Sequence, residues 1–80
     1  MSFLLKVKFV PATNFRGSRV SAKSADEKLG TTISWDDEKN AQENYDAVVE
    51  EWIKRADIPN STIEYIGEWK DSRFYRIWNK

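Results

Sequence analysis

The fold of this 80-residue chain is decided by one stretch, residues 40–56, which reads NAQENYDAVVEEWIKRA. Asn40 and Glu43 fit a capping box, in which each side chain accepts a backbone N–H of the other residue. Apolar residues then recur at spacings of three and four, which predicts one apolar stripe along a helix of about four turns. The stripe consists of Ala41, Tyr45, Val48, Val49, Trp52, Ile53 and Ala56. Pro59 is expected to end the helix, because the residue before a proline avoids the helical conformation.

Segments on both sides of this helix alternate apolar and polar residues, as half-buried strands do. Three precede the helix and two follow it, at residues 3–10, 18–24, 29–35, 62–69 and 73–78. A lone amphipathic helix has to cover the apolar face of a sheet. The sequence therefore predicts a single α+β domain over residues 1–80. We expect a two-layer sandwich in the order β-β-β-α-β-β, with an antiparallel sheet of about five strands and the helix on one face.

The composition excludes several kinds of site. The chain has no cysteine and no histidine, which removes disulfides, thiolate nucleophiles, serine–histidine triads and the usual zinc, copper or iron sites. No pair of carboxylates is marked by a motif, and so small a domain offers little pocket volume, so we expect a non-enzymatic protein without cofactor or metal. The N-terminus lacks signal-peptide features and no apolar run reaches the length of a membrane span, which predicts a cytoplasmic protein without a membrane partner.

The formal net charge of zero, from 13 basic and 13 acidic residues, conceals two opposed blocks. Residues 1–24 contain five basic residues and no acidic one, a net charge of +5, and residues 36–57 contain three basic and eight acidic residues, a net charge of −5. If the helix covers one sheet face, its acidic outer side and the basic outer face of the first strands point in opposite directions. The competing interpretation is that exposed faces simply require charge.

The connection between the first two strands, residues 13–19, combines a glycine turn with two arginines and two hydroxyl groups. Backbone N–H groups around such a turn, together with forked guanidinium groups, can hold a phosphate or a carboxylate. The alternative is a plain connection in which Asn14 and Gly17 adopt turn conformations and the arginines pair with helix carboxylates or stay solvated.

The outward positions of the first strands favour a basic sheet face. The candidate nucleic-acid-binding residues are Lys6, Lys8, Arg16, Arg19 and Lys23, with Ser21, Arg76 and a flanking Phe74 or Trp78 beside them. Single-stranded nucleic acid is bound in this way, by stacking on rings and neutralisation of phosphates. Core and strand-edge packing explains the aromatic residues equally well, and the chain has no RNP-like motif. Nucleic-acid binding is therefore the alternative function.

Residues 11–22, which read PATNFRGSRVSA, resemble a group of small proteins encoded in phages, prophages and bacterial plasmids. That group shares a leading strand, a T-N-x-R-G-S-R-x-x-A run, a further strand, an N-x-x-E-like helix start and a C-terminal β segment. This chain has Tyr45 where the group often has a histidine early in the helix. The resemblance implies an origin in mobile elements, and small phage proteins of this size are often non-enzymatic binders of host or defence proteins.

A protein partner is accordingly the leading hypothesis. We expect a binding module of phage or mobile-element origin that acts by protein–protein contact in the host cell cytoplasm, inhibiting or modulating a host or defence factor. Trp35 and Trp52 are interpreted as core residues, whereas Trp69 and Trp78 on the last hairpin suit a surface hot spot. The expected contacts are Arg16, Arg19, Trp69 and Trp78.

Overall fold

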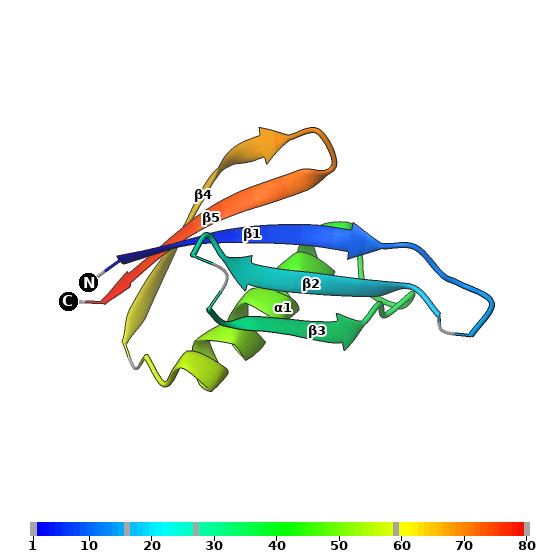
Figure 1. Ribbon diagram of the computed structural model, residues 1–80, viewed down its shortest axis with the longest axis horizontal. Helices are drawn as coiled ribbons and strands as arrows, with labels where there is room; N and C mark the ends of the chain where they lie inside the picture. Colours follow the sequence, from blue (N-terminus) through cyan, green and yellow to red (C-terminus); the bar gives the residue numbers. More distant parts are fainter. Residues whose placement is uncertain (1, 16, 27, 59, 80) are drawn as a thin grey trace.

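Five strands and one helix succeed one another in the predicted order in the computed structural model, which describes residues 2–15, 17–26, 28–58 and 60–79 (Figure 1). The strands are β1 (Ser2–Val10), β2 (Arg19–Ser24), β3 (Gly30–Ser34), β4 (Ser61–Trp69) and β5 (Ser72–Asn79), and the helix is α1 (Ala41–Ala56). The predicted α+β fold is confirmed, and the element boundaries differ from the expected ones by one residue at most at each end.

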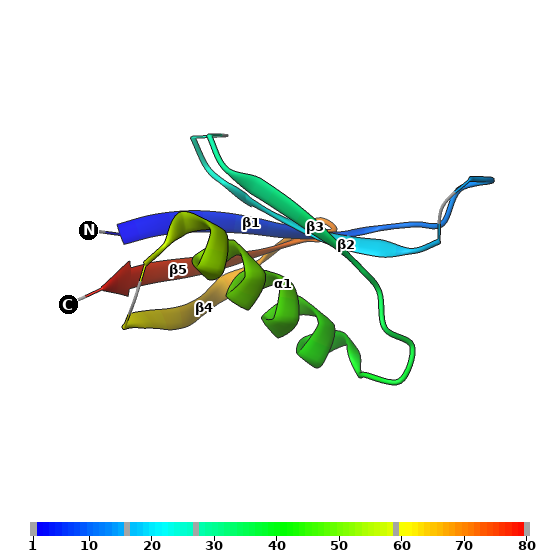
Figure 2. The same cartoon turned by 90° about the horizontal axis from the view of Figure 1, so that it is seen from below.

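The sheet is antiparallel throughout, with the strand order β3-β2-β1-β5-β4. The first strand is therefore central and pairs with both β2 and β5, so that both termini lie at the same end of the molecule (Figure 1). The helix α1 lies on one face and packs on β1, β2 and β3 (Figure 2). The opposite face of the sheet carries no helix.

The core fills the space between α1 and the sheet. Its largest side chain is that of Trp52, which is 1% exposed, donates its indole N–H to the carbonyl oxygen of Leu29 at 3.0 Å and contacts the ring of Phe3 edge-on. The other buried apolar residues are Leu5, Val7, Val20, Ala22, Val48, Val49, Ile58, Tyr75 and Ile77. Burial of each such side chain stabilises the fold by about 1.5–3 kcal/mol.

Local hydrogen bonds fix both ends of α1. The capping box is confirmed: the Asn40 side chain accepts the Glu43 N–H at 2.8 Å, and the Glu43 carboxylate accepts the Asn40 N–H at 3.2 Å. The helix ends at Asp57, whose backbone has a left-handed conformation (φ 55°). Its N–H donates to the carbonyl oxygens of Ile53 and Lys54. Pro59, the predicted stop, lies outside the described residues. Among the described residues, the helix end is closed by this left-handed cap at Asp57.

A buried polar residue, Asn44, joins the helix to the segment before it. Its side chain is 1% exposed, accepts the Asp36 N–H at 2.8 Å and donates to the Asp36 carbonyl at 3.0 Å. It also donates to the Asn40 carbonyl at 3.1 Å. Asn44 therefore anchors the connection between β3 and α1. Asn44 is not one of the apolar residues of the predicted stripe, and no sequence signal indicated this role.

Candidate functional site

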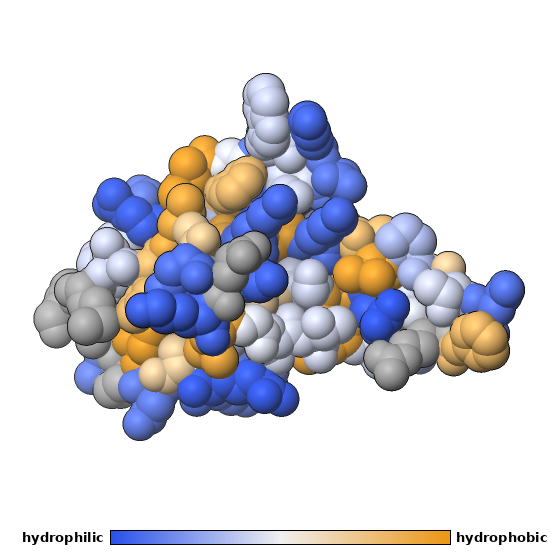
Figure 3. Space-filling model, in the orientation of Figure 1, coloured by the Kyte–Doolittle hydropathy of each residue, from blue (hydrophilic) through white to orange (hydrophobic). Residues whose placement is uncertain are grey.

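The sheet face opposite α1, called the helix-free face below, displays the side chains that alternate with the core. In β1, Lys6 and Lys8 alternate with the buried Leu5 and Val7, and the same alternation turns cations of β2 and β5 outward. The cations of this face are Lys6, Lys8, Arg19, Lys23 and Arg76. Figure 3 views the helix-free face and shows hydrophilic side chains spread among apolar ones. Five cations among the described residues therefore lie on one face of the sheet.

The register of the sheet places an aromatic ring beside two of these lysines. Lys6 pairs with Lys23 on β2 and with Phe74 on β5, so the three residues form one row across three strands. A hollow of about 300 Å³ is lined by Lys6, Lys23, Ser24, Ala25 and Phe74. Lys6 forms no ion pair with any residue that the structure describes. This row offers positive charge and a flat apolar surface within one shallow site.

On the side of the β4–β5 hairpin, two carboxylates offset positive charge of this face. Glu64 on β4 lies 3.6 Å from the guanidinium of Arg76, and Asp71 in the turn lies 3.9 Å from the Lys8 ammonium. Arg76 also lies over the Trp78 ring, 4.9 Å from its centroid. Lys8 and Arg76 are therefore each balanced by a carboxylate, whereas Lys6 is not, among the residues that the structure describes.

The acidic block lies on the other side of the molecule. Glu43, Asp46 and Glu50 are exposed on α1, which covers the opposite face of the sheet. The two charge blocks thus face in opposite directions, as the predicted packing of the helix requires.

The structure does not bring the predicted partner-binding residues together. Arg16 lies outside the described residues. Trp69 is 68% exposed near the β4–β5 turn, whereas Trp78 is half-buried at the far end of the hairpin, opposite Thr62. Seven residue steps along β4 separate Thr62 from Trp69, a distance of about 20 Å. Arg19 begins β2, on the opposite side of the sheet centre. These residues do not form one patch.

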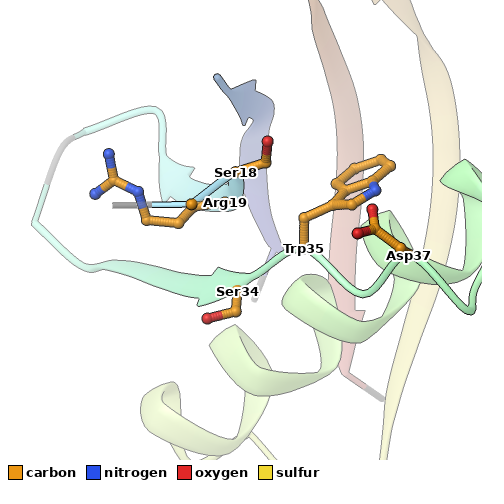
Figure 4. A pocket seen from close by; sticks show the side chains of 6 residues that line it. Ser18, Arg19, Ser34, Trp35 and Asp37 are labelled. Carbon is orange, nitrogen blue, oxygen red and sulfur yellow. The ribbon is translucent and has the colours of Figure 1, made fainter. Parts of the chain in front are cut away.

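The hollow beside Arg19 is not arranged to hold an anion. It measures about 520 Å³ and is lined by Gly17, Ser18, Arg19, Ser34, Trp35 and Asp37. The guanidinium of Arg19 points away from Trp35 and Asp37 (Figure 4), and the Asp37 carboxylate itself forms part of the wall. The donors of Ser18 and Arg19 do not converge on one point. For the residues described, the loop fits the plain connection better than the anion cradle.

The edge strand β4 exposes Trp69, which the sequence had marked as a surface candidate, together with three apolar side chains that the sequence pattern assigned to no particular surface. These side chains are between 42% and 68% exposed: Ile63 42%, Tyr65 52%, Ile66 53% and Trp69 68%. On its other side, β4 is hydrogen-bonded to β5. A shift of register between Tyr65 and Gly67 marks a β-bulge at Ile66. An unpaired edge with exposed apolar residues is a surface on which another chain can dock.

Phe15 is a surface residue that sequence reasoning missed. It is 94% exposed and belongs to the long connection between β1 and β2, which extends beyond the sheet (Figure 1). The sequence did hold a signal for this exposure. Phe15 lies in a turn-forming Thr-Asn-Phe-Arg-Gly-Ser run, outside the alternating pattern of either neighbouring strand, so it has no place on the core face of the sheet.

Asp26 in the turn between β2 and β3 has a structural role. The Ser24 hydroxyl donates to its carboxylate at 2.6 Å and the Lys28 N–H donates at 3.1 Å, and these bonds lower the pKa of Asp26 below its ordinary value of 3.8. Both bonds favour the charged form and close the turn. Asp26 therefore shapes the hairpin at the border of the basic face.

Comparison with known proteins found no matching family model, no matching curated protein and no matching solved structure. Within the described ranges, no three side chains of the ligating types group to hold a metal ion. No helix in that part of the chain has both the length and the apolar character that crossing a membrane requires.

Proposed function

We propose that this chain is a small non-enzymatic nucleic-acid-binding protein that uses its helix-free face. The observation that carries the proposal is the row of Lys23, Lys6 and Phe74 around the hollow of about 300 Å³. Lys8 and Arg19 extend the positive charge along the same two strands. Neutralisation of phosphates by such cations supplies most of the affinity in sequence-independent binding.

A charge-neutralising variant with a matched control tests this proposal. Lys6→Gln/Lys23→Gln removes two charges from the helix-free face, and Lys54→Gln/Arg55→Gln removes two from the last turn of α1. We expect the first variant to bind a labelled oligonucleotide about ten-fold more weakly at low salt, because each lost phosphate contact also removes its counterion release. The second should bind within about two-fold of the unmodified protein. Equal affinities of the two variants, or no binding at low salt by the unmodified protein, would contradict the proposal.

A protein partner is the second candidate function, and the exposed apolar edge of β4 favours it. We infer that such a partner would be a host or defence factor in the host cytoplasm, in keeping with the resemblance to small proteins of mobile elements. Trp69, 68% exposed, is the side chain best placed for this contact, since exposed tryptophans are frequent hot spots of interfaces. Trp78, Arg19 and, from the sequence, Arg16 remain further proposed contacts.

Affinity capture from a host lysate separates this candidate from the first. Trp69→Ala removes the exposed ring, and Leu4→Ala, which removes another exposed apolar side chain, serves as the control. We expect one discrete protein to be retained by the unmodified chain and by Leu4→Ala but lost with Trp69→Ala. Identical capture by all three chains would remove the support for Trp69 as a contact.

A further inference from the structure

The outward side chains of β5 form a track of planar groups. Phe74, Arg76 and Trp78 alternate along the strand with the buried Tyr75 and Ile77, so all three lie on the helix-free face. Phe74 and Trp78 are only partly buried, and the Arg76 guanidinium stacks over the Trp78 ring. At about 3.3–3.4 Å per residue, the two rings are about 13 Å apart along the strand. Spacing on this scale suits a short run of bases.

The neighbouring strands β1 and β2 supply the positive charge. Lys6 lies directly opposite Phe74, Lys23 lies beyond Lys6, and Lys8 follows two residues further along β1. Directly opposed residues of antiparallel strands have Cβ atoms about 4.5–5.5 Å apart. A base that stacks on Phe74 would therefore have its phosphate within reach of the Lys6 ammonium.

A carboxylate on β4 determines on which side the phosphates would lie. Glu64 lies opposite Arg76 on the outer side of β5 and is ion-paired with it at 3.6 Å. A phosphate on that side would meet a like charge, whereas a phosphate over β1 and β2 would meet Lys6 and Lys23, with Asp71 beside Lys8 only at the end near the β4–β5 turn. The face is thus divided into a stacking track on β5 and a phosphate track on β1 and β2.

We propose that the ligand of the helix-free face is a single-stranded nucleic acid that lies along β1 and β5, with its bases on Phe74 and on the Arg76 guanidinium that covers Trp78, and its phosphates on Lys6, Lys8 and Lys23. This inference rests on the proposed nucleic-acid function and deepens it. Stacking on protein rings requires unpaired bases, because a duplex already uses both faces of each base. A flat sheet face also lacks a protruding helix or ribbon that could enter a major groove.

The test measures the affinity of the unmodified chain at low salt for three labelled ligands of twelve nucleotides. These are a single strand, its duplex and an abasic strand with the same phosphates. We expect the single strand to bind about ten-fold or more tightly than the abasic strand, since stacking on a ring contributes about 5- to 150-fold per base. Phe74→Leu, which retains an apolar side chain, should weaken binding of the single strand by about the same factor and leave the abasic strand unaffected. Lys6→Gln should weaken both.

The outcomes distinguish the two proposals. Equal affinities for the single strand and the abasic strand would overturn the stacking track and leave a general polyanion surface, with the proposed function intact. Tighter binding of the duplex would overturn it as well. Absence of binding to any of the three ligands at low salt would refute the proposed function itself. The comparison of ligands uses the unmodified chain, so it stands even if Phe74→Leu folds poorly.

Discussion

Asn44→Ala should lower the free energy of unfolding by about 2 kcal/mol. The Asn44 side chain is 1% exposed and makes two hydrogen bonds with the backbone of Asp36 and one with the carbonyl of Asn40. Each bond contributes about 0.5–1.5 kcal/mol net, which gives about 3 kcal/mol for the three. Alanine has the higher helix propensity and offsets this loss by roughly 0.5 kcal/mol. Asp36 is an exposed residue, so water compensates a further part of the loss.

Urea denaturation followed by far-UV circular dichroism measures this change. With a slope on the order of 1 kcal/mol per molar urea for so small a domain, the midpoint should fall by about 2 M. Glu50→Ala, an exposed substitution on the same helix, is the control and should change stability by less than about 0.5 kcal/mol. If Asn44→Ala proves as stable as Glu50→Ala, the hydrogen bonds of Asn44 do not anchor the connection between β3 and α1, and the reasoning is refuted.

Three further predictions concern the core, the surface and pH. Trp52→Ala should cost about 3–5 kcal/mol of a total stability of about 5–10 kcal/mol and leave much of the chain unfolded by circular dichroism; a native spectrum and melting curve would contradict this. Trp69→Ala should change the stability by less than about 0.5 kcal/mol, and a larger loss in thermal melts would mean that the ring supports the fold. The Asp26 carboxyl should titrate below its ordinary 3.8 by NMR and nearer to that value in Ser24→Ala. Because the pKa is lowered in the folded state, the stabilisation from these bonds is present above pH 3.8 and is lost as the pH falls through the lowered value. Equal titration midpoints of Asp26 in the unmodified chain and in Ser24→Ala would contradict the role of the Ser24 hydrogen bond.

The helix and the strands were predictable because their signals are local. The capping box of Asn40 and Glu43 and the spacing of the apolar stripe depend on neighbours within one or two turns. The strand order was not predictable, because the pairing of β1 with β5 joins the two ends of the chain and leaves no local signal. The burial of Asn44 was also missed, since its partners on Asp36 lie outside the periodic pattern.

The exposed edge of β4 has a simple physical cause. Ile63 and Tyr65 alternate like core residues and lie opposite Ile77 and Tyr75, yet each is about half exposed. One helix is about 10–12 Å wide, whereas five strands at about 4.8 Å spacing span roughly 20 Å, so one helix cannot cover all of them. Since α1 packs over β1, β2 and β3, the far strand remains uncovered.

The candidate site was predictable in part. Alternation alone placed Lys6, Lys8 and Lys23 outward, and the structure sets them on one face. The position of Phe74 beside Lys6 follows from the register between β1 and β5, which no spacing in the sequence specifies. The row that carries the proposed function therefore emerged only from the structure.

The central claim, that the helix-free face binds nucleic acid through its cations, is tested most directly by the salt dependence of affinity for a single strand. If Lys6, Lys8, Arg19 and Lys23 each neutralise one phosphate, the logarithm of the association constant should fall with the logarithm of the salt concentration with a slope of about −3. Affinity should then decrease about 50-fold between 50 and 200 mM salt. A slope near zero, or no measurable binding at the lowest salt concentration, would contradict the account.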